Sequence, residues 1–317
     1  MEVENREPQD ESFPLPPAAS SPPFHTERRA LSPLKFAVVL LVAEFFGYQI
    51  FGGVLAVAFM FLKIIPDMAP AARLATMIAQ MLFLLGGSIL ALKLQGWDVR
   101  TTLRIRPVRM SHIALVIVCV IALQFAFQGY LSLQEYLMNT YIIPDSLQPV
   151  LKRLEEFIEK MTEQIVTAKT PLEGVFVWIV VAFTPAICEE ILFRGVAQHA
   201  FERRFRVRWA AVLTGSIFAL YHMNPVSFVP LAVLGVFFSI VVWRTDSIFI
   251  SMAAHLANNS FAVISLYFIG ADAKGKEIAV SSAAATDIRL ALAGVAVFLL
   301  CFLAFWRLSG RKPRSSV

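Results

Sequence analysis

Two adjacent carboxylates and one arginine lie inside a long apolar stretch of the sequence. Glu190 and Arg194 are four residues apart, which places them on one face of a helix, where they can pair. Glu189 is five residues from the arginine and points elsewhere, so it stays free to act as a base. Ionisable side chains within membrane-spanning helices are functional candidates by default. The alternative is that all three residues form a buried network that only fixes helix packing.

Two of the five histidines lie deep in later apolar stretches, and both are candidates for the same site. His222 lies in the first of these stretches. His255 and Asn259, in the second, are four residues apart and face the same way, and both can donate hydrogen bonds to a developing oxyanion. Singly, each of these polar groups is also typical of a hydrogen bond between membrane helices. Together with Glu189 they indicate a hydrolytic site in which a carboxylate activates water.

The same side chains leave the question of a metal open. Glu189, His222 and His255 include the ligand types of a zinc site that has two histidines, one glutamate and one open position. A zinc ion there would activate a bound water and polarise the carbonyl. In the metal-free alternative, Glu189 is itself the general base. The sequence therefore allows either no cofactor or one Zn²⁺, and the pairing of His255 with Asn259 favours the metal-free mechanism, because asparagine is a poor zinc ligand.

The composition places these residues in a membrane protein. Of the 317 residues, 57% are hydrophobic and only 16% are charged, and the mean hydropathy is +0.67. The net charge of +5 does not indicate nucleic-acid binding, because the basic residues lie in short loops between apolar segments. We therefore expect the lipid bilayer, and no nucleic acid, as a partner.

Eight apolar segments predict an all-α, polytopic bundle of about eight spanning helices. The fifth and sixth segments are short and are joined only by the loop around Asn224, so residues 209–243 form either two full spans or a re-entrant hairpin beside a cavity. The segments are residues 34–62, 72–94, 111–133, 172–194, 209–223, 228–243, 247–269 and 288–306.

Outside the spans, two stretches have a distinct character. Residues 1–33 are polar and rich in proline, and we expect a disordered tail. Residues 145–169 carry one apolar stripe and one charged face, which predicts an amphipathic helix that is either docked on the membrane surface or a gate over a substrate entrance.

The distribution of basic residues predicts the orientation. With both termini in the cytoplasm, most of the 28 lysines and arginines lie on the cytoplasmic side. The tail and the lack of an organellar signal favour a bacterial inner membrane. The expected units are a cytoplasmic tail, three helices, the amphipathic helix, a catalytic core, and a last helix with a basic tail, at residues 1–33, 34–144, 145–169, 170–270 and 271–317.

The order of three motifs resembles a known family. Glu-Glu-x-x-x-Arg, Phe-x-x-x-His and His-x-x-x-Asn on separate spanning helices are similar to the CAAX-protease and bacteriocin-processing family, also called the Abi, CPBP or type II CAAX prenyl endopeptidase family. The resemblance covers roughly residues 170–270, and the earlier helices fit the family's eight-helix layout. The matching residues are Glu189, Glu190, Arg194, Phe218, His222, His255 and Asn259.

The resemblance implies an intramembrane endopeptidase that acts on a membrane-bound or prenylated, CAAX-like peptide or protein. It implies that Glu189 activates a water with help from His222, and that His255 and Asn259 stabilise the tetrahedral intermediate. Glu190 with Arg194 would support the site. The family is commonly labelled metalloprotease. The alternatives are a catalytically silent scaffold or immunity protein of the same fold, and a proton-coupled transporter.

Overall fold

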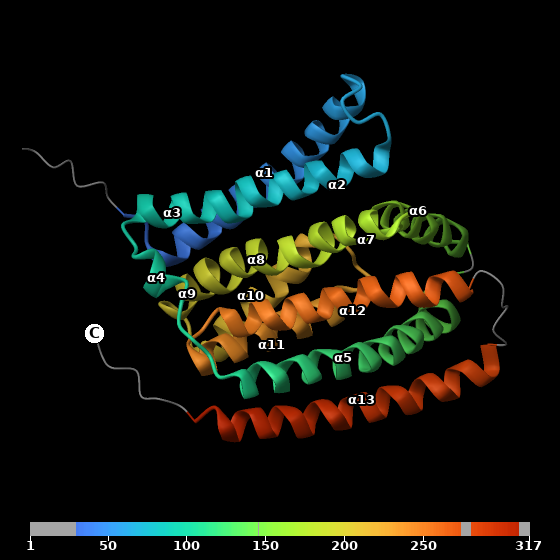
Figure 1. The fold of residues 1–317 in the computed structure, drawn as a ribbon. Helices are drawn as coiled ribbons and strands as arrows, with labels where there is room; N and C mark the ends of the chain where they lie inside the picture. Colours follow the sequence, from blue (N-terminus) through green and yellow to red (C-terminus); the bar gives the residue numbers. More distant parts are fainter. Residues whose placement is uncertain (1–29, 145, 274–279, 311–317) are drawn as a thin grey trace, which may run out of the picture. The chain divides into compact units, whose positions relative to one another are not determined.

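The computed structural model describes residues 30–144, 146–273 and 280–310, and the regular structure in these ranges is entirely helical, without a strand (Figure 1). Most of the expected tail, residues 1–29, and the end of the basic C-terminal tail, residues 311–317, lie outside the described residues. The described residues from Leu31 onward form one compact unit.

The helices follow the expected segments closely. The first half comprises α1 (Pro33–Phe61), α2 (Met68–Ala79), α3 (Ser88–Gln95), α4 (Val99–Thr102), α5 (Met110–Leu137) and α6 (Gln148–Val166). The second half comprises α7 (Pro171–Trp178), α8 (Thr184–Glu190), α9 (Gln198–Glu202), α10 (Val207–Tyr221), α11 (Phe228–Thr245), α12 (Phe249–Ala273) and α13 (Val280–Leu308). Four π-helical segments connect or extend them: η1 (Gln80–Gly87), η2 (Met138–Ile142), η3 (Ile179–Phe183) and η4 (Ile191–Ala197).

Among the residues that the structure describes, six helical stretches are long and apolar enough to cross a membrane, so the chain is an integral membrane protein. They are Pro33–Phe61, Met68–Gln95, Met110–Ile142, Pro171–Glu202, Phe228–Thr245 and Ile288–Leu308. The other two expected spans correspond to α10, which has 15 residues, and to α12, which carries the polar motif of His255 and Asn259. The eight-span count, and the choice between two spans and a hairpin for residues 209–243, stay predictions.

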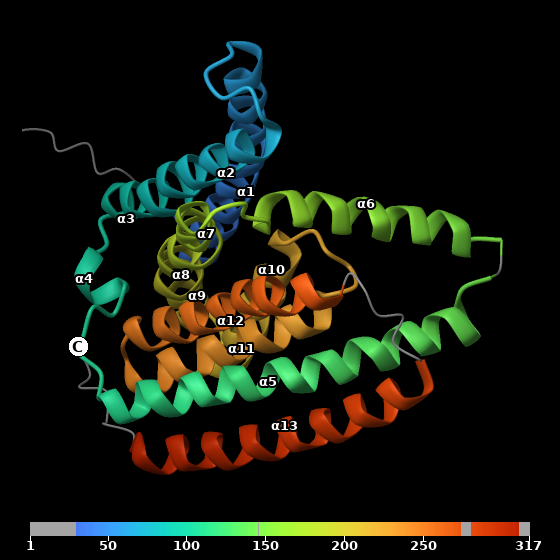
Figure 2. The same ribbon diagram turned by 45° about the vertical axis from the view of Figure 1, so that its right-hand side comes forward.

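The stretch that carries Glu189 and Glu190 is the most enclosed of these candidates. Of its most apolar window, 56% is buried, against 11% for the span in α13. One buried hydrophobic cluster joins this stretch to α1, η1 and α10, and a second cluster joins α5, α11, α12 and α13. Helices α5 and α13 lie side by side along their length (Figures 1 and 2). The candidate site therefore lies in the interior of the bundle and not on its periphery.

The expected amphipathic helix is present as α6, and a buried arginine fixes its C-terminal end. Arg73 of α2 is 2% exposed. Its guanidinium donates to the backbone carbonyls of Ile165, at 2.8 Å, and Thr167, and it pairs with the Glu173 carboxylate at 2.5 Å. This one side chain thus connects α2, the end of α6 and the start of α7. Whether α6 lies on the membrane surface or acts as a gate stays a prediction.

Helices α10 and α11 approach each other at backbone distance because two glycines face each other. A Cβ atom added to Gly235 would lie 2.6 Å from the Cα of Gly215, and one added to Gly215 would lie 2.6 Å from the backbone nitrogen of Val236. Close approach through small residues is a common way for membrane helices to pack. The contact brings Phe218 of α10 and Phe238 of α11 toward the buried guanidinium of Arg194.

We expect Gly235→Ala to lower the thermal unfolding midpoint in detergent, because the new methyl group must push the two backbones apart. The free energy of unfolding should fall by about 1–3 kcal/mol, the usual cost of overpacking a close contact. Gly53→Ala in α1 is the matched control, since a Cβ at Gly53 would meet nothing within 4 Å. Equal midpoints for the two variants would contradict the assigned helix contact.

Candidate active site

The stretch Pro171–Glu202 is an alternation of α-helical and π-helical turns. The helix α8, which ends at Glu190, lies between η3 and η4. Single π-helical turns are rare and occur frequently at functional sites. Pro185 lies in the first turn of α8, directly after η3, where a missing backbone donor is best tolerated. The two glutamates therefore lie at the end of a short α-helical segment between two π-helical segments.

Pro185 explains the contact that Asn259 makes. Proline has no backbone N–H, so it cannot donate to the carbonyl of Val181, four residues earlier. The Asn259 amide nitrogen donates to this carbonyl at 3.0 Å, and the Asn259 amide oxygen accepts from Asn258 at 3.0 Å. The expected role of Asn259, as a donor to an oxyanion together with His255, stays a prediction. One of its two amide hydrogens is used to join α12 to η3.

Glu190 and Arg194 form the buried ion pair that their spacing predicts. The guanidinium Nη1 lies 2.8 Å from Glu190 Oε1, and both side chains are 0% exposed. The guanidinium also lies over the rings of Phe218, at 4.4 Å, and Phe238, at 5.0 Å, and donates to the carbonyl of Gly235 at 3.3 Å. Ring faces attract a cation, so both charges have partners inside the bundle.

His255 lies between the two glutamates. Its Nδ1 is 2.8 Å from Glu190 Oε1, and its Nε2 is 4.0 Å from Glu189 Oε2. The ring stacks on Phe238 at 5.5 Å and is only 3% exposed. An ionised carboxylate can only accept, so Nδ1 carries a hydrogen and the tautomer leaves Nε2 directed toward Glu189.

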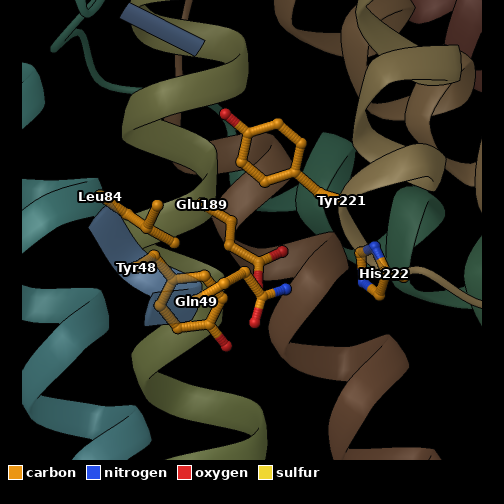
Figure 3. A pocket seen from close by; sticks show the side chains of 6 residues that line it. All are labelled: Tyr48, Gln49, Leu84, Glu189, Tyr221 and His222. Carbon is orange, nitrogen blue, oxygen red and sulfur yellow. The ribbon is translucent and has the colours of Figure 1, made fainter. Parts of the chain in front are cut away.

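Glu189 lies in a cavity, apart from the arginine. The cavity has a volume of about 210 Å³, and Figure 3 shows the side chains that line it. The Glu189 side chain is 14% exposed, and its Oε2 atom has no hydrogen-bond partner among the described residues. The structure thus confirms that the two adjacent glutamates point to different surroundings. The lining residues are Tyr48, Gln49, Leu84, Glu189, Tyr221 and His222.

His222 lines the same cavity from the end of α10. Its Nδ1 is 2.8 Å from the carbonyl oxygen of Phe218, one turn earlier. A carbonyl only accepts, so this contact places the hydrogen on Nδ1 and leaves the lone pair of the neutral ring on Nε2. His222 is exposed, unlike the buried His255. It is therefore the histidine better placed to exchange a proton with water in the cavity.

Several residues of this site are absent from the sequence prediction. Phe238 is one of 27 phenylalanines, and no spacing distinguishes it. Tyr48 and Gln49 come from α1, far from the motifs, and only the fold brings them to Glu189. Glu44, also in α1, is 5% exposed, and its Oε2 atom has no partner among the described residues. The sequence alone could have indicated Glu44, because it is a single acidic residue within the first apolar segment.

The described residues do not form a metal site as they stand. In this part of the chain, no group of three or more His, Cys, Asp or Glu side chains is arranged to hold a metal ion. Of the three candidate zinc ligands, Glu189 and His222 line the cavity, whereas His255 lies buried against Glu190.

Fold and site together define a class of protein. It is an all-helical integral membrane protein with a buried ion pair, Glu190 with Arg194. Beside this pair, Glu189 and His222 line a cavity. Residues 171–261 match the type II CAAX prenyl endopeptidase Rce1-like family, which confirms the resemblance carried by the motifs. All six candidate site residues lie within this segment. Comparison with curated proteins and with solved structures finds no match to the chain.

We expect Arg194→Ala to destabilise the protein far more than Glu189→Gln. The first change leaves Glu190 as an unpaired charge in a fully buried position, which should lower the free energy of unfolding by roughly 3–5 kcal/mol. The second change removes a charge that faces a cavity and has no ion pair with the arginine. Thermal unfolding of both variants in the same detergent checks the order. A lower midpoint for Glu189→Gln would contradict the assignment of Glu190 to the structural ion pair and of Glu189 to the cavity.

Proposed function

We propose that the protein is an intramembrane endopeptidase that hydrolyses a peptide bond of a membrane-associated or lipid-modified, CAAX-like substrate. The match of residues 171–261 suggests a peptidase. The observation that carries the proposal further is the separation of the adjacent glutamates: Glu190 is fully buried in an ion pair, while Glu189 shares a cavity with His222.

In the proposed reaction, Glu189 is the general base. It takes a proton from a water molecule in the cavity as the water oxygen bonds to the carbonyl carbon of the substrate. The π-electron pair of the carbonyl moves to its oxygen, which becomes the oxyanion of a tetrahedral intermediate. When the carbon–nitrogen bond breaks, the proton held by Glu189 passes to the leaving nitrogen. General acid–base catalysis of this kind typically contributes 10²–10⁴-fold to the rate.

His222 is the second proton site in this scheme. Its Nδ1 is engaged by the Phe218 carbonyl, so Nε2 is free to accept a proton from water or from the intermediate. Both Glu189 and His222 reach the cavity, which allows one proton to be shared between them during the two steps. This assignment agrees with the roles that the family resemblance implies.

Glu190, Arg194 and His255 are positioning residues in this scheme. Arg194 keeps Glu190 ionised, and the carboxylate of Glu190 fixes the tautomer and orientation of His255. The other ring nitrogen, Nε2, lies 4.0 Å from Glu189 Oε2, and it can donate on that side only when both ring nitrogens carry a hydrogen. A carboxylate behind a histidine performs this orienting role in many hydrolases.

The class of substrate rests on two different grounds. The cavity is lined from α1, η1, α8 and the end of α10, in or next to stretches long and apolar enough to span a membrane, which favours a membrane-associated substrate. The preference for a CAAX-like, prenylated peptide rests on the family match alone. The charge distribution predicts cytoplasmic termini, and the tail and the lack of an organellar signal favour a bacterial inner membrane; both stay predictions.

We expect Glu189→Gln to abolish hydrolysis while leaving the fold intact, with a loss of at least 10²–10⁴-fold. The test is to incubate the purified protein with a library of membrane peptides, including prenylated ones that end in a Cys-aliphatic-aliphatic-X sequence, and to identify products by mass spectrometry. Glu135→Gln is the control, because Glu135 is exposed on α5 and does not line the cavity. Cleavage by Glu189→Gln at the wild-type rate would refute the assignment. Failure of the wild-type protein to cleave any peptide would favour a silent scaffold of the same fold.

A further inference from the structure

We propose that Gln49 of α1 is a further catalytic residue, whose side-chain amide donates a hydrogen bond to the carbonyl oxygen of the scissile peptide bond and to the oxyanion that forms from it. This inference rests on the proposed function. It assigns a role to a residue outside residues 171–261, the segment that matches the family.

The cavity needs a hydrogen-bond donor, and two of its donors already have acceptors. The Tyr221 hydroxyl donates to the backbone carbonyl of Leu41. His222 uses Nδ1 on the Phe218 carbonyl. Both groups are therefore held by the protein itself before a substrate arrives. The Tyr48 hydroxyl accepts from the Gln80 side chain, whose own Oε1 atom has no partner among the described residues.

The two donors that the motifs suggest for an oxyanion are each engaged through one atom. The Asn259 amide donates one hydrogen to Val181, and Nδ1 of His255 faces Glu190. A further donor in the cavity lining would reach a carbonyl next to Glu189 directly.

Gln49 differs because its amide contact is weak. Its Nε2 atom lies 3.8 Å from the sulfur of Met223, a thioether that accepts hydrogen bonds poorly. A peptide carbonyl is a much stronger acceptor and would displace this contact at little cost. Figure 3 shows the Gln49 side chain extending into the cavity together with that of Glu189.

The fold holds Gln49 in this place. Tyr221 at the end of α10 donates to the Leu41 carbonyl of α1, and its ring packs edge-on against Phe45 at 5.1 Å. These two contacts fix α1 against the end of α10, so that Gln49 faces the turn that contains His222 and Met223. A preorganised donor requires little rearrangement when charge develops, which is what makes an oxyanion site effective.

A neutral donor also suits the base beside it. A lysine or arginine at this position would pair with the Glu189 carboxylate and lower its ability to take a proton from water. The glutamine amide supplies hydrogen bonds without neutralising that charge. In the proposed step, Glu189 accepts the water proton, the new carbon–oxygen bond forms, and the carbonyl electron pair moves to the oxygen that Gln49 holds.

The test compares Gln49→Met with two neighbouring substitutions on a prenylated peptide ending in a Cys-aliphatic-aliphatic-X sequence. Gln49→Met keeps the length of the side chain and removes the donor, so kcat should fall by about 10²–10³-fold, as for other single oxyanion donors. KM and the thermal midpoint should change little. Met223→Leu, which removes only the sulfur acceptor, should keep kcat within a few-fold of wild type. Tyr48→Phe measures the contribution of the neighbouring hydroxyl separately. Should Gln49→Met fail to fold, Gln49→Leu is a second neutral variant without a donor and should show the same loss.

The outcomes separate the two proposals. Wild-type kcat in Gln49→Met, with an inactive Glu189→Gln, would overturn the role of Gln49 and leave the proposed function standing. A rise in KM alone would also overturn it, because it would mean ground-state binding only. An equal loss in Met223→Leu or Tyr48→Phe would assign the effect to packing or to the tyrosine. Full activity of Glu189→Gln would instead overturn the proposed function on which the inference rests.

Discussion

A fully buried charge pair inside a membrane-spanning helix is the constraint on which the site depends. Removing a carboxylate and a guanidinium from water costs several kcal/mol per ion, so each must find further partners. Glu190 gains the imidazole of His255, and Arg194 gains two aromatic faces and a backbone carbonyl. These partners come from α10, α11 and α12. Three other helices are therefore held around η4 by one ion pair.

The same constraint explains why α10 and α11 are in backbone contact. Phe218 follows Gly215 by one turn, and Phe238 follows Gly235 by one turn, so the facing glycines set the spacing of the two rings that enclose Arg194. Glu189, one residue away from the pair, is left outside this enclosure. Two adjacent identical side chains thus acquire different chemistry because a helix turns their directions apart by about 100°.

The sequence predicts the parts of this site that depend on local geometry. The pairing of Glu190 with Arg194 follows from a spacing of four, and the effect of Pro185 on the helix follows from its missing N–H. The partner of the freed Val181 carbonyl does not, because Asn259 reaches it only through the packing of α12. The roles of Gln49 and Phe238 cannot be predicted from the sequence either, because they arise from contacts between helices. The apolar pattern located the helices well, but hydropathy alone does not say whether α10 crosses the bilayer.

The lining of the cavity has a consequence for the products of the proposed reaction. Among the side chains that line it in the described part of the chain, one is a carboxylate and none is a lysine or arginine. The proposed hydrolysis would produce a new carboxylate next to Glu189, once that residue has given up its proton. Two like charges repel strongly where water is scarce. The arrangement that suits attack by water would therefore bind the acid product weakly and favour its departure.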